Sequence, residues 1–279
     1  VRSYGPLRLG ARQRSFDVPG RIRALPPFES RKHLPSRLAS LRQLDGRSAV
    51  RTRGQGTEFD SLRDYVEGDD VRSIDWRATA RRRNVVVRTW QPERDRRVII
   101  VLDTSRTSAG RIGDQPRLDA AMDAALLLAA LASRAGDRVD FLAGDRWLRA
   151  RVAAAANRTT LLSDLVQAMA PLDPALLEAS WPTLASAIAD TSRRRALVVL
   201  LTPLEPAAIQ ESLLPSLPAL TRHHRVVVAS VADPALASMA ATRTTTEQAY
   251  AAAAAERTVA LQERTAAVLR RMGVAVIDA

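Results

Sequence analysis

Three oxygen-bearing side chains follow a short apolar run and together could bind a metal ion. Residues 98–102 read VIIVL, and Asp103, Ser105 and Thr107 come at alternate positions after them. An apolar run bounded by charge predicts a buried parallel strand, and open α/β sheets bind ligands just beyond the carboxyl ends of their strands. One carboxylate and two hydroxyls are hard oxygen donors, which suit Mg²⁺ or Mn²⁺ better than zinc. We therefore expect a metal-centred adhesion site here; the alternative is that these side chains only cap the following turn.

Further ligands for such an ion must come from loops after other strands, because the carboxyl ends of parallel strands meet at one edge of the sheet. Thr183, at the start of a predicted short helix, or Thr159 could supply another hydroxyl. The loop after the predicted strand 196–202 is expected to supply a second carboxylate. Residues 202–205 read TPLE, so this strand does not end in an aspartate, and Glu205 or a water molecule would take that place.

The elements that must position these residues alternate along the chain from residue 98. Short apolar runs predict strands over 98–102, 138–143, 147–152, 196–202, 225–231 and 274–277. Helical periodicity predicts helices over 117–135, 159–169, 183–190 and 247–272, with Gly136 ending the first. This alternation predicts an α/β fold with a doubly wound, mostly parallel, Rossmann-like sheet over residues 96–279. Residues 1–53 are expected to be the end of a small β module with a linker.

A second segment, residues 54–95, combines many paired charges with aromatic residues. Such density predicts a hydrogen-bonded platform with buried aromatic side chains, which would orient the metal-binding face or bind a partner itself. The alternative is that the paired charges form a purely structural salt-bridge hub. Its turn at residues 68–70 reads GDD and is typical of a helix N-cap. The residues expected to form this interaction platform are Glu58, Arg63, Asp69, Asp70, Arg72, Asp75 and Trp76.

Composition restricts the function classes. The 279-residue chain has no cysteine, which excludes disulfides and cysteine-bound zinc. Its net charge is +12, and Lys32 is its only lysine. We expect no nucleic-acid partner, because no helix-turn-helix, zinc or stacking-aromatic pattern accompanies the charge, although a basic nucleic-acid-binding domain is one alternative. A basic domain beside an anionic membrane also fits, with any anchor upstream of Val1, since a first residue other than Met suggests a fragment.

Catalytic patterns are weak in this sequence. His223 and His224 stand together before a predicted strand, and the chain has neither a Gly-x-Ser-x-Gly elbow nor a phosphate-binding loop. We therefore expect a non-enzymatic binding module. The alternative is a metal-dependent hydrolase that uses Asp69, Asp70 and Asp75, since two-metal hydrolysis needs several converging carboxylates.

Residues 54–82, GQGTEFDSLRDYVEGDDVRSIDWRATARR, resemble the signature of the bacterial "domain of unknown function 58" family. The family pattern runs Gly-x-Gly-x-Glu-Phe, Leu-Arg-x-Tyr, Gly-Asp-Asp, Arg-x-Ile-Asp-Trp and Ala-x-Ala-Arg, and every element is present. The stretch VVVRTWQPERDRRVIIVLDTSRTS resembles the family's entry into a von Willebrand factor type A domain. RLDAAMDAALLLAALASRAGDRV and VADPAL are similar to later parts of that domain.

This resemblance implies a von Willebrand factor type A-like domain preceded by a β module. It places a metal-ion-dependent adhesion site on Asp103, Ser105 and Thr107, with Thr183 as the second-loop residue. It also implies hydrophobic helices upstream of the chain, a location at the cytoplasmic face of the bacterial membrane, and a MoxR-type AAA ATPase as partner. The bound ion would leave a coordination position for an acidic side chain of a protein partner. Thr107 stands where the family commonly has serine, and a Thr-Pro pair replaces the strand-end aspartate.

Overall fold

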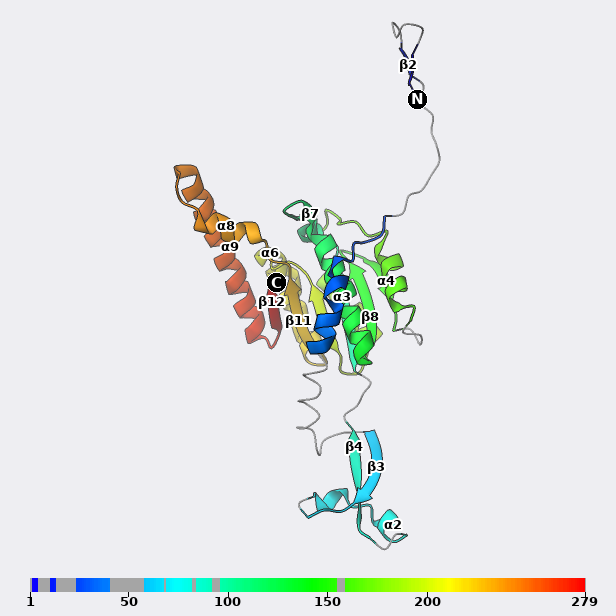
Figure 1. Ribbon diagram of the computed structural model, residues 1–279. Coiled ribbons are helices and arrows are strands. Elements are labelled where there is room, and N and C mark those ends of the chain that lie inside the picture. Colours follow the sequence, from blue (N-terminus) through cyan, green and yellow to red (C-terminus); the bar gives the residue numbers. More distant parts are fainter. Residues whose placement is uncertain are drawn as a thin grey trace.

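The structure, a computed structural model, describes residues 2–4, 11–13, 24–40, 58–67, 69–81, 84–91, 96–154 and 159–278. Among these, a six-stranded sheet has the strand order β12-β11-β10-β5-β8-β9 (Figure 1). All neighbouring strands in it are parallel except β8 and β9. The predicted doubly wound, mostly parallel sheet is therefore confirmed. Its strands are β5 (Arg97–Asp103), β8 (Arg138–Gly144), β9 (Leu148–Val152), β10 (Leu197–Leu201), β11 (Arg225–Ser230) and β12 (Ala275–Asp278).

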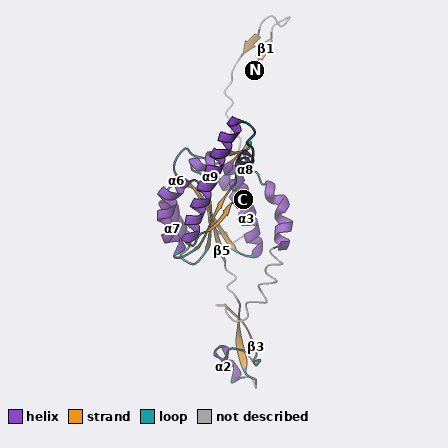
Figure 2. Ribbon diagram, turned by 90° about the vertical axis from the view of Figure 1, so that its left-hand side faces the viewer, coloured by secondary structure: helices purple, strands orange, loops and turns teal. Residues whose placement is uncertain are grey.

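Helices cover both faces of this sheet (Figure 2). One face packs against α3 (Arg117–Ala135) and α4 (Leu161–Met169), the other against α5 (Trp181–Thr191), α7 (Leu214–Thr221) and α9 (Thr246–Arg271). Successive residues of β5 point to opposite faces, so Ile100 joins the first core and Ile99 the second. Burial on both faces explains why β5 is a continuous apolar run rather than an alternating pattern.

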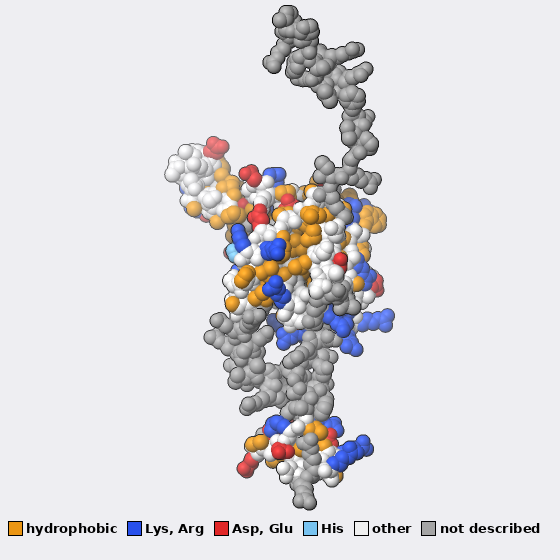
Figure 3. Space-filling view, turned by 45° about the vertical axis from the view of Figure 1, so that its right-hand side comes forward, with side chains coloured by type: hydrophobic (Ala, Val, Ile, Leu, Met, Phe, Trp, Pro, Cys, Tyr) orange, Lys and Arg blue, Asp and Glu red, His pale blue; other side chains and the backbone are white. Residues whose placement is uncertain are grey.

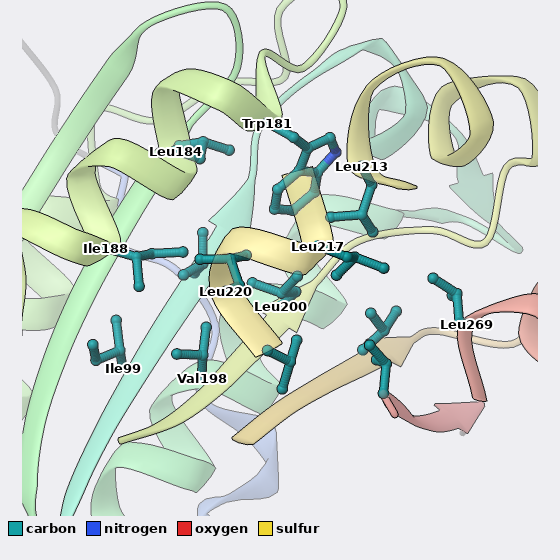
Figure 4. Packing of buried hydrophobic residues seen from close by; sticks show 14 of the residues in the cluster. Ile99, Trp181, Leu184, Ile188, Val198, Leu200, Leu213, Leu217, Leu220 and Leu269 are labelled. Carbon is teal, nitrogen blue, oxygen red and sulfur yellow. The ribbon is translucent and has the colours of Figure 1, made fainter. Parts of the chain in front are cut away.

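The core on the α5 and α7 face is built around large side chains from several elements (Figure 4). Trp181 of α5 is 1% exposed, and Leu217 of α7 and Leu200 of β10 are fully buried. Leu269 of α9 belongs to the same cluster. This packing holds α5, α7 and α9 against the central strands, and so fixes the loops that follow those strands.

The predicted helix 117–135 is confirmed as α3, and its C-terminal end follows from one glycine. Gly136 has φ +92°, and its amide donates to the carbonyl oxygens of Ala132 and Ser133. This left-handed conformation is favourable for glycine and costly for residues with a Cβ.

Several helical segments lie where no helix is predicted. They are α6 (Pro206–Ala208), a π-helical turn (Ile209–Leu213), α7, and α8 (Pro234–Ala241). Prolines at 206, 215, 218 and 234 give these stretches the composition of loops. In the structure Pro206 and Pro234 occupy first-turn positions, where the missing N–H is not needed. Pro215 and Pro218 lie within the helical run 206–221, which burial of residues such as Leu217 stabilises.

The described residues before the sheet form smaller pieces. β1 (Arg2–Tyr4) pairs with β2 (Ala11–Gln13), and a 3₁₀ turn, η2 (Glu29–His33), leads into helical residues 34–40. The backbone N–H of Ser30 donates to Asp123 Oδ1 (3.1 Å), and Leu34 is only 7% exposed, so this segment packs on α3. The expectation of a β module and linker over 1–53 falls largely on residues outside those that the structure describes.

The predicted platform segment contains an antiparallel pair, β3 (Glu58–Asp64) and β4 (Val86–Gln91). A 3₁₀ turn, η3 (Val71–Ser73), and a short helix, α2 (Trp76–Thr79), lie between the two strands in the sequence.

Candidate functional site

The loop after β5 carries the three predicted metal ligands at the centre of the sheet. β5 lies between β10 and β8, and Asp103, its last residue, pairs with Gly144 at the end of β8. A 3₁₀ turn, η4 (Arg106–Ala109), follows and folds the chain back over the strand end. Asp103 and Ser105 are each 1% exposed, and Thr107 is 9% exposed. The strand end and the tight turn thus bring the three side chains together, as predicted from their spacing.

Hydrogen bonds join these side chains into one cluster around the Asp103 carboxylate. Oδ1 accepts the backbone N–H of Ser105 (2.8 Å), and Oδ2 accepts the hydroxyl of Thr107 (3.3 Å). The Ser105 and Thr107 hydroxyl oxygens lie 3.0 Å apart. We call Asp103, Ser105, Thr107 and Thr202, which is described next, the hydroxyl cluster.

Thr202 is a member of this cluster that the sequence did not identify as a site residue. Its hydroxyl donates to Asp103 Oδ2 at 2.6 Å, although the two residues are 99 positions apart. Thr202 follows β10 directly, is 5% exposed, and its amide donates to the carbonyl oxygen of Ala229 in β11 (3.2 Å). A polar residue at the carboxyl end of a predicted buried strand was the available signal, but only the pairing of β10 with β5 makes it a neighbour of Asp103.

The electrostatic state of Asp103 is unusual for a buried carboxylate. Burial raises the pKa of Asp103, and the hydrogen bonds from Thr202, Ser105 and Thr107 oppose that rise. Among the described residues no basic side chain forms an ion pair with it. Buried charges are normally paired with an opposite charge or bound to a metal ion. Within the described part of the chain Asp103 has no such partner, so a proton or a bound cation would have to neutralise it.

The two other predicted ligands are Thr183 and Glu205, and among the described residues neither forms a hydrogen bond with the hydroxyl cluster. Thr183, in the first turn of α5, is exposed, and its hydroxyl lies 2.8 Å from Ser180 Oγ. Glu205 is exposed at the N-cap of α6, and its charge contributes to raising the pKa of Arg106 in η4. Their role as metal ligands stays a prediction.

A second loop, residues 170–180, is fastened to the loop of the hydroxyl cluster. Ala175 N–H donates to the carbonyl oxygen of Thr104 (2.8 Å), and Arg106 N–H donates to that of Leu177 (2.9 Å). The Arg106 guanidinium also forms an ion pair with Glu178. In this loop the side chain of Leu176 is 85% exposed.

The turn between β8 and β9 adds a second exposed apolar side chain at the same edge of the sheet. Trp147 is 60% exposed, and the Arg146 guanidinium lies 5.8 Å from its ring centroid. The buried Asp145 holds this turn, because its carboxylate accepts Arg149 Nε (2.8 Å), Thr104 Oγ1 (3.1 Å) and Trp147 N–H (3.2 Å). Burial raises the pKa of Asp145, but these hydrogen bonds and the Arg149 charge outweigh it, and the net pKa is lowered. We call Leu176 and Trp147 the apolar rim.

A cavity of about 220 Å³ opens beside the hydroxyl cluster. Thr202, Ser108 and Ser230 contribute hydroxyls to its lining, together with Arg117 at the start of α3. Arg117 Nη1 donates to the carbonyl oxygen of Thr107 (3.3 Å), while its Nε is buried and has no hydrogen-bond partner. The rest of the lining is mostly apolar and also includes the Asp123 carboxylate, which accepts the Ser30 N–H (3.1 Å). The guanidinium and the hydroxyls are the groups of this cavity that suit a small acidic group.

Three carboxylates of the predicted platform, those of Asp69, Asp70 and Asp75, are engaged locally, while the side chain of Glu58 lies outside what the structure describes. Asp75 accepts the N–H groups of Arg77 (3.0 Å) and Ala78 (2.9 Å) and pairs with Arg88 (2.8 Å). Hydrogen bonds to these N–H groups and to Arg88 lower the pKa of Asp75. Asp75 thus caps α2 and binds β4 to it.

The other two carboxylates have similar local roles. Asp69 pairs with Arg63 (2.6 Å), which raises the pKa of that guanidinium, and Asp70 accepts Arg72 N–H (3.0 Å) to cap η3. Within the described part of the chain, no three histidine, aspartate or glutamate side chains are grouped to hold a metal ion. The expectation of buried aromatic side chains is wrong for Trp76, the first residue of α2, which is 69% exposed.

The helices of the described residues include none with both the length and the apolar composition needed to cross a bilayer.

Comparison with known proteins gives similar curated relatives from mycobacteria. The chain is 29% identical over 185 residues to the uncharacterized protein Rv1480 of Mycobacterium tuberculosis and, equally, to the uncharacterized protein Mb1516 of Mycobacterium bovis. Each alignment covers 65% of this chain and 56% of the relative, so the chain spans about half the length of the curated relatives it matches.

Two solved structures are also similar to parts of the chain. The conserved hypothetical protein BatB from Bacteroides thetaiotaomicron is 14% identical with a TM-score of 0.38, over 49% of this chain and 66% of that one. An uncharacterized membrane spanning protein from Vibrio fischeri is 18% identical with a TM-score of 0.25, over 49% of this chain and 71% of that one.

The family described as "Protein of unknown function DUF58" matches residues 61–271. This match includes most of the platform segment and nearly all of the six-stranded sheet with its hydroxyl cluster. Because it spans well over half of the sequence, the chain belongs to the DUF58 family.

Proposed function

We propose that this chain is a non-enzymatic protein-interaction module whose binding face is the hydroxyl cluster with the adjoining cavity and apolar rim. The observation that carries the proposal is the buried Asp103 carboxylate, which is bound by neutral hydrogen-bond donors and has no basic partner among the described residues. Such a group is completed by a cation or a proton rather than by the protein itself. Exposed Leu176 and Trp147 beside it supply the apolar contact area that protein partners use.

The cation would be Mg²⁺ or Mn²⁺, held by Asp103, Ser105, Thr107 and Thr202. The donors fit, because one carboxylate and three hydroxyls linked by hydrogen bonds are hard oxygen ligands, and Mg²⁺ commonly binds through one or two carboxylates and keeps several waters. When bound, the ion would supply the positive charge that attracts an acidic side chain of the partner. Thr183 and Glu205 remain candidates for completing the set.

The cavity beside the cluster supports an acidic group on the partner. Arg117 contributes a guanidinium to its lining, and its Nε N–H lacks an acceptor. The partner's carboxylate would meet hydroxyls and this guanidinium, while the Asp123 carboxylate in the same cavity is engaged by the Ser30 N–H. On the face shown in Figure 3, basic side chains lie in separate groups among apolar and acidic ones, which favours a protein over a nucleic acid, whose backbone suits a continuous basic stripe.

The partner we propose is a MoxR-type AAA ATPase, for which this module would act as an adaptor at the cytoplasmic face of the bacterial membrane. This proposal rests on the family membership and on the docking chemistry of the face. Anchorage would come from segments outside this chain.

The first test is calorimetric titration of Mg²⁺ and Mn²⁺ into the wild-type chain and into Asp103→Asn. The matched control is Asp190→Asn, which neutralises an exposed carboxylate on α5. We expect saturable binding by the wild type and the control, and none by Asp103→Asn. Equal heats from Asp103→Asn and the wild type would refute the cation site.

The second test measures binding of a MoxR-type ATPase to the same proteins by surface plasmon resonance. All measurements are made at one Mg²⁺ concentration, because the ATPase itself needs the ion. We expect Asp103→Asn to weaken binding and Asp190→Asn to leave it unchanged. Binding that is absent from the wild type, or unaffected by Asp103→Asn, would refute the role of this face in holding the ATPase.

A further inference from the structure

The long helix α9 carries an exposed stripe of apolar and arginine side chains that no described element covers. Figure 1 places α9 outermost on the β12 side of the sheet. Its buried positions, which include Ala266 and Leu269, face the core. On another side of the helix, exposed residues recur at intervals of four and three positions. We call them the α9 stripe: Tyr250, Ala254, Arg257, Leu261, Arg264, Val268 and Arg271.

The spacing of the α9 stripe is that of a coiled-coil seam. Intervals of four and three residues give an average of 3.5, so all members fall on one narrow line along the helix. Tyr250 is 76% exposed, Leu261 38% and Val268 39%, so the apolar members are open to solvent. The arginines Arg257, Arg264 and Arg271 recur every seventh residue between them.

The arginines of the stripe lack a negative partner in their own helix. No aspartate or glutamate lies three or four positions from any of them, which are the distances at which helical side chains meet. None of them forms an ion pair among the described residues, whereas Glu256, on a neighbouring line of α9, pairs with Arg243. The stripe therefore presents positive charge at regular intervals along an apolar seam.

Contacts at both ends of α9 hold this helix in place. A capping box fixes its start, since Thr245 Oγ1 accepts Gln248 N–H (3.2 Å) and Gln248 Oε1 accepts Thr245 N–H (3.1 Å). The core contacts of Leu269 hold its other end. The stripe is thus preorganised, which reduces the entropy lost when a partner binds.

We propose that the α9 stripe docks an acidic amphipathic helix of a protein partner, with the partner's carboxylates opposite Arg257, Arg264 and Arg271. Charge complementarity selects this occupant. A second copy of the chain would place its own arginines, and no carboxylate, opposite Arg257, Arg264 and Arg271 along the shared seam. A membrane surface is disfavoured because interfacial helices separate a wide apolar face from their basic residues, whereas here the two alternate on one line. This surface is distinct from the hydroxyl cluster and goes beyond the proposed cation-linked function.

The test uses fluorescence anisotropy with a labelled amphipathic peptide that has leucine on its seam and glutamate beside it. The stripe variant is Arg257→Glu/Arg264→Glu, which keeps helix-forming residues at exposed mid-helix positions. The matched control is Arg194→Glu/Arg195→Glu, which makes the same change of charge at exposed positions between α5 and β10. Circular dichroism and thermal melting establish that each variant is folded.

We expect the stripe variant to bind the acidic peptide at least about tenfold more weakly than the wild type, and the control to differ by less than about threefold. The stripe variant should also gain affinity for a peptide in which lysine replaces glutamate, because the charges are then complementary again. The proposal is overturned if the wild type ignores the acidic peptide or if both variants lose affinity equally. Binding to phosphatidylglycerol vesicles without binding to the peptide would overturn it in favour of a lipid surface.

Discussion

Removing the Thr202 hydroxyl tests the reasoning about the hydroxyl cluster most directly. Thr202→Val keeps the shape of a side chain that is 5% exposed but deletes the 2.6 Å hydrogen bond to Asp103 Oδ2. A hydrogen bond to a charged group is worth about 1.5–3 kcal/mol and one between neutral groups about 0.5–1.5 kcal/mol. With Asp103 ionised, the free energy of unfolding should therefore fall by about 2 kcal/mol.

The pH dependence of that loss has a definite sign. Burial raises the pKa of Asp103 above its value in the unfolded chain, so its contribution to stability is present at low pH and is lost as the pH rises through the folded pKa. The Thr202 bond stabilises the ionised form and opposes this loss. Thr202→Val should therefore destabilise the protein most at pH values above the raised pKa of Asp103, and less as the pH falls through that pKa.

Urea denaturation of the metal-free protein, followed by circular dichroism over a pH series, measures both effects. Thr202→Ser keeps the hydroxyl and should recover most of the stability. Thr221→Val is the matched control, because the Thr221 hydroxyl only bonds the Leu217 carbonyl oxygen in its own helix. A loss below about 0.5 kcal/mol for Thr202→Val at the alkaline end of the series would refute the argument, and so would a loss that is the same in acid.

Three further outcomes follow from the structure. Asp103→Asn removes a buried charge without a countercharge, so metal-free Asp103→Asn should unfold at a higher temperature than the wild type at pH values above the raised pKa of Asp103. In calorimetry the wild type alone should gain about 2.7 kcal/mol when Mg²⁺ is at a hundred times its Kd. Gly136→Ala forces a Cβ into a backbone with φ +92° and should cost about 1 kcal/mol in urea denaturation, and an unchanged midpoint would count against the C-cap. Leu176→Glu, at a side chain that is 85% exposed, should change stability by less than about 0.5 kcal/mol yet weaken ATPase binding; unchanged binding would remove the apolar rim from the interface.

Secondary structure was predictable where the local signal was strong. β5, β10 and β11 are apolar runs bounded by charged or turn residues, and α3 has a long apolar face ended by Gly136. The prediction failed over residues 206–221, where the prolines give the sequence the composition of a loop. There, burial of Leu213 and Leu217 in the core outweighs the low helix propensity of the sequence.

The sequence alone determined the local part of the candidate site. Asp103, Ser105 and Thr107 lie within five positions of one another, so the end of one strand and one turn suffice to bring them together. The same holds for the caps formed by Asp70 and Asp75, whose acceptors and donors are two or three residues apart.

Only the tertiary structure decided which distant residues join that site. Thr202 reaches Asp103 because β10 pairs with β5 in parallel register, Leu201 beside Leu102, so that the residues after them meet at one edge. Nothing in the local sequence specifies that β10, rather than another strand, is the neighbour of β5. Strand order depends on which helices fit together over the two faces of the sheet, a property of packing across the whole chain.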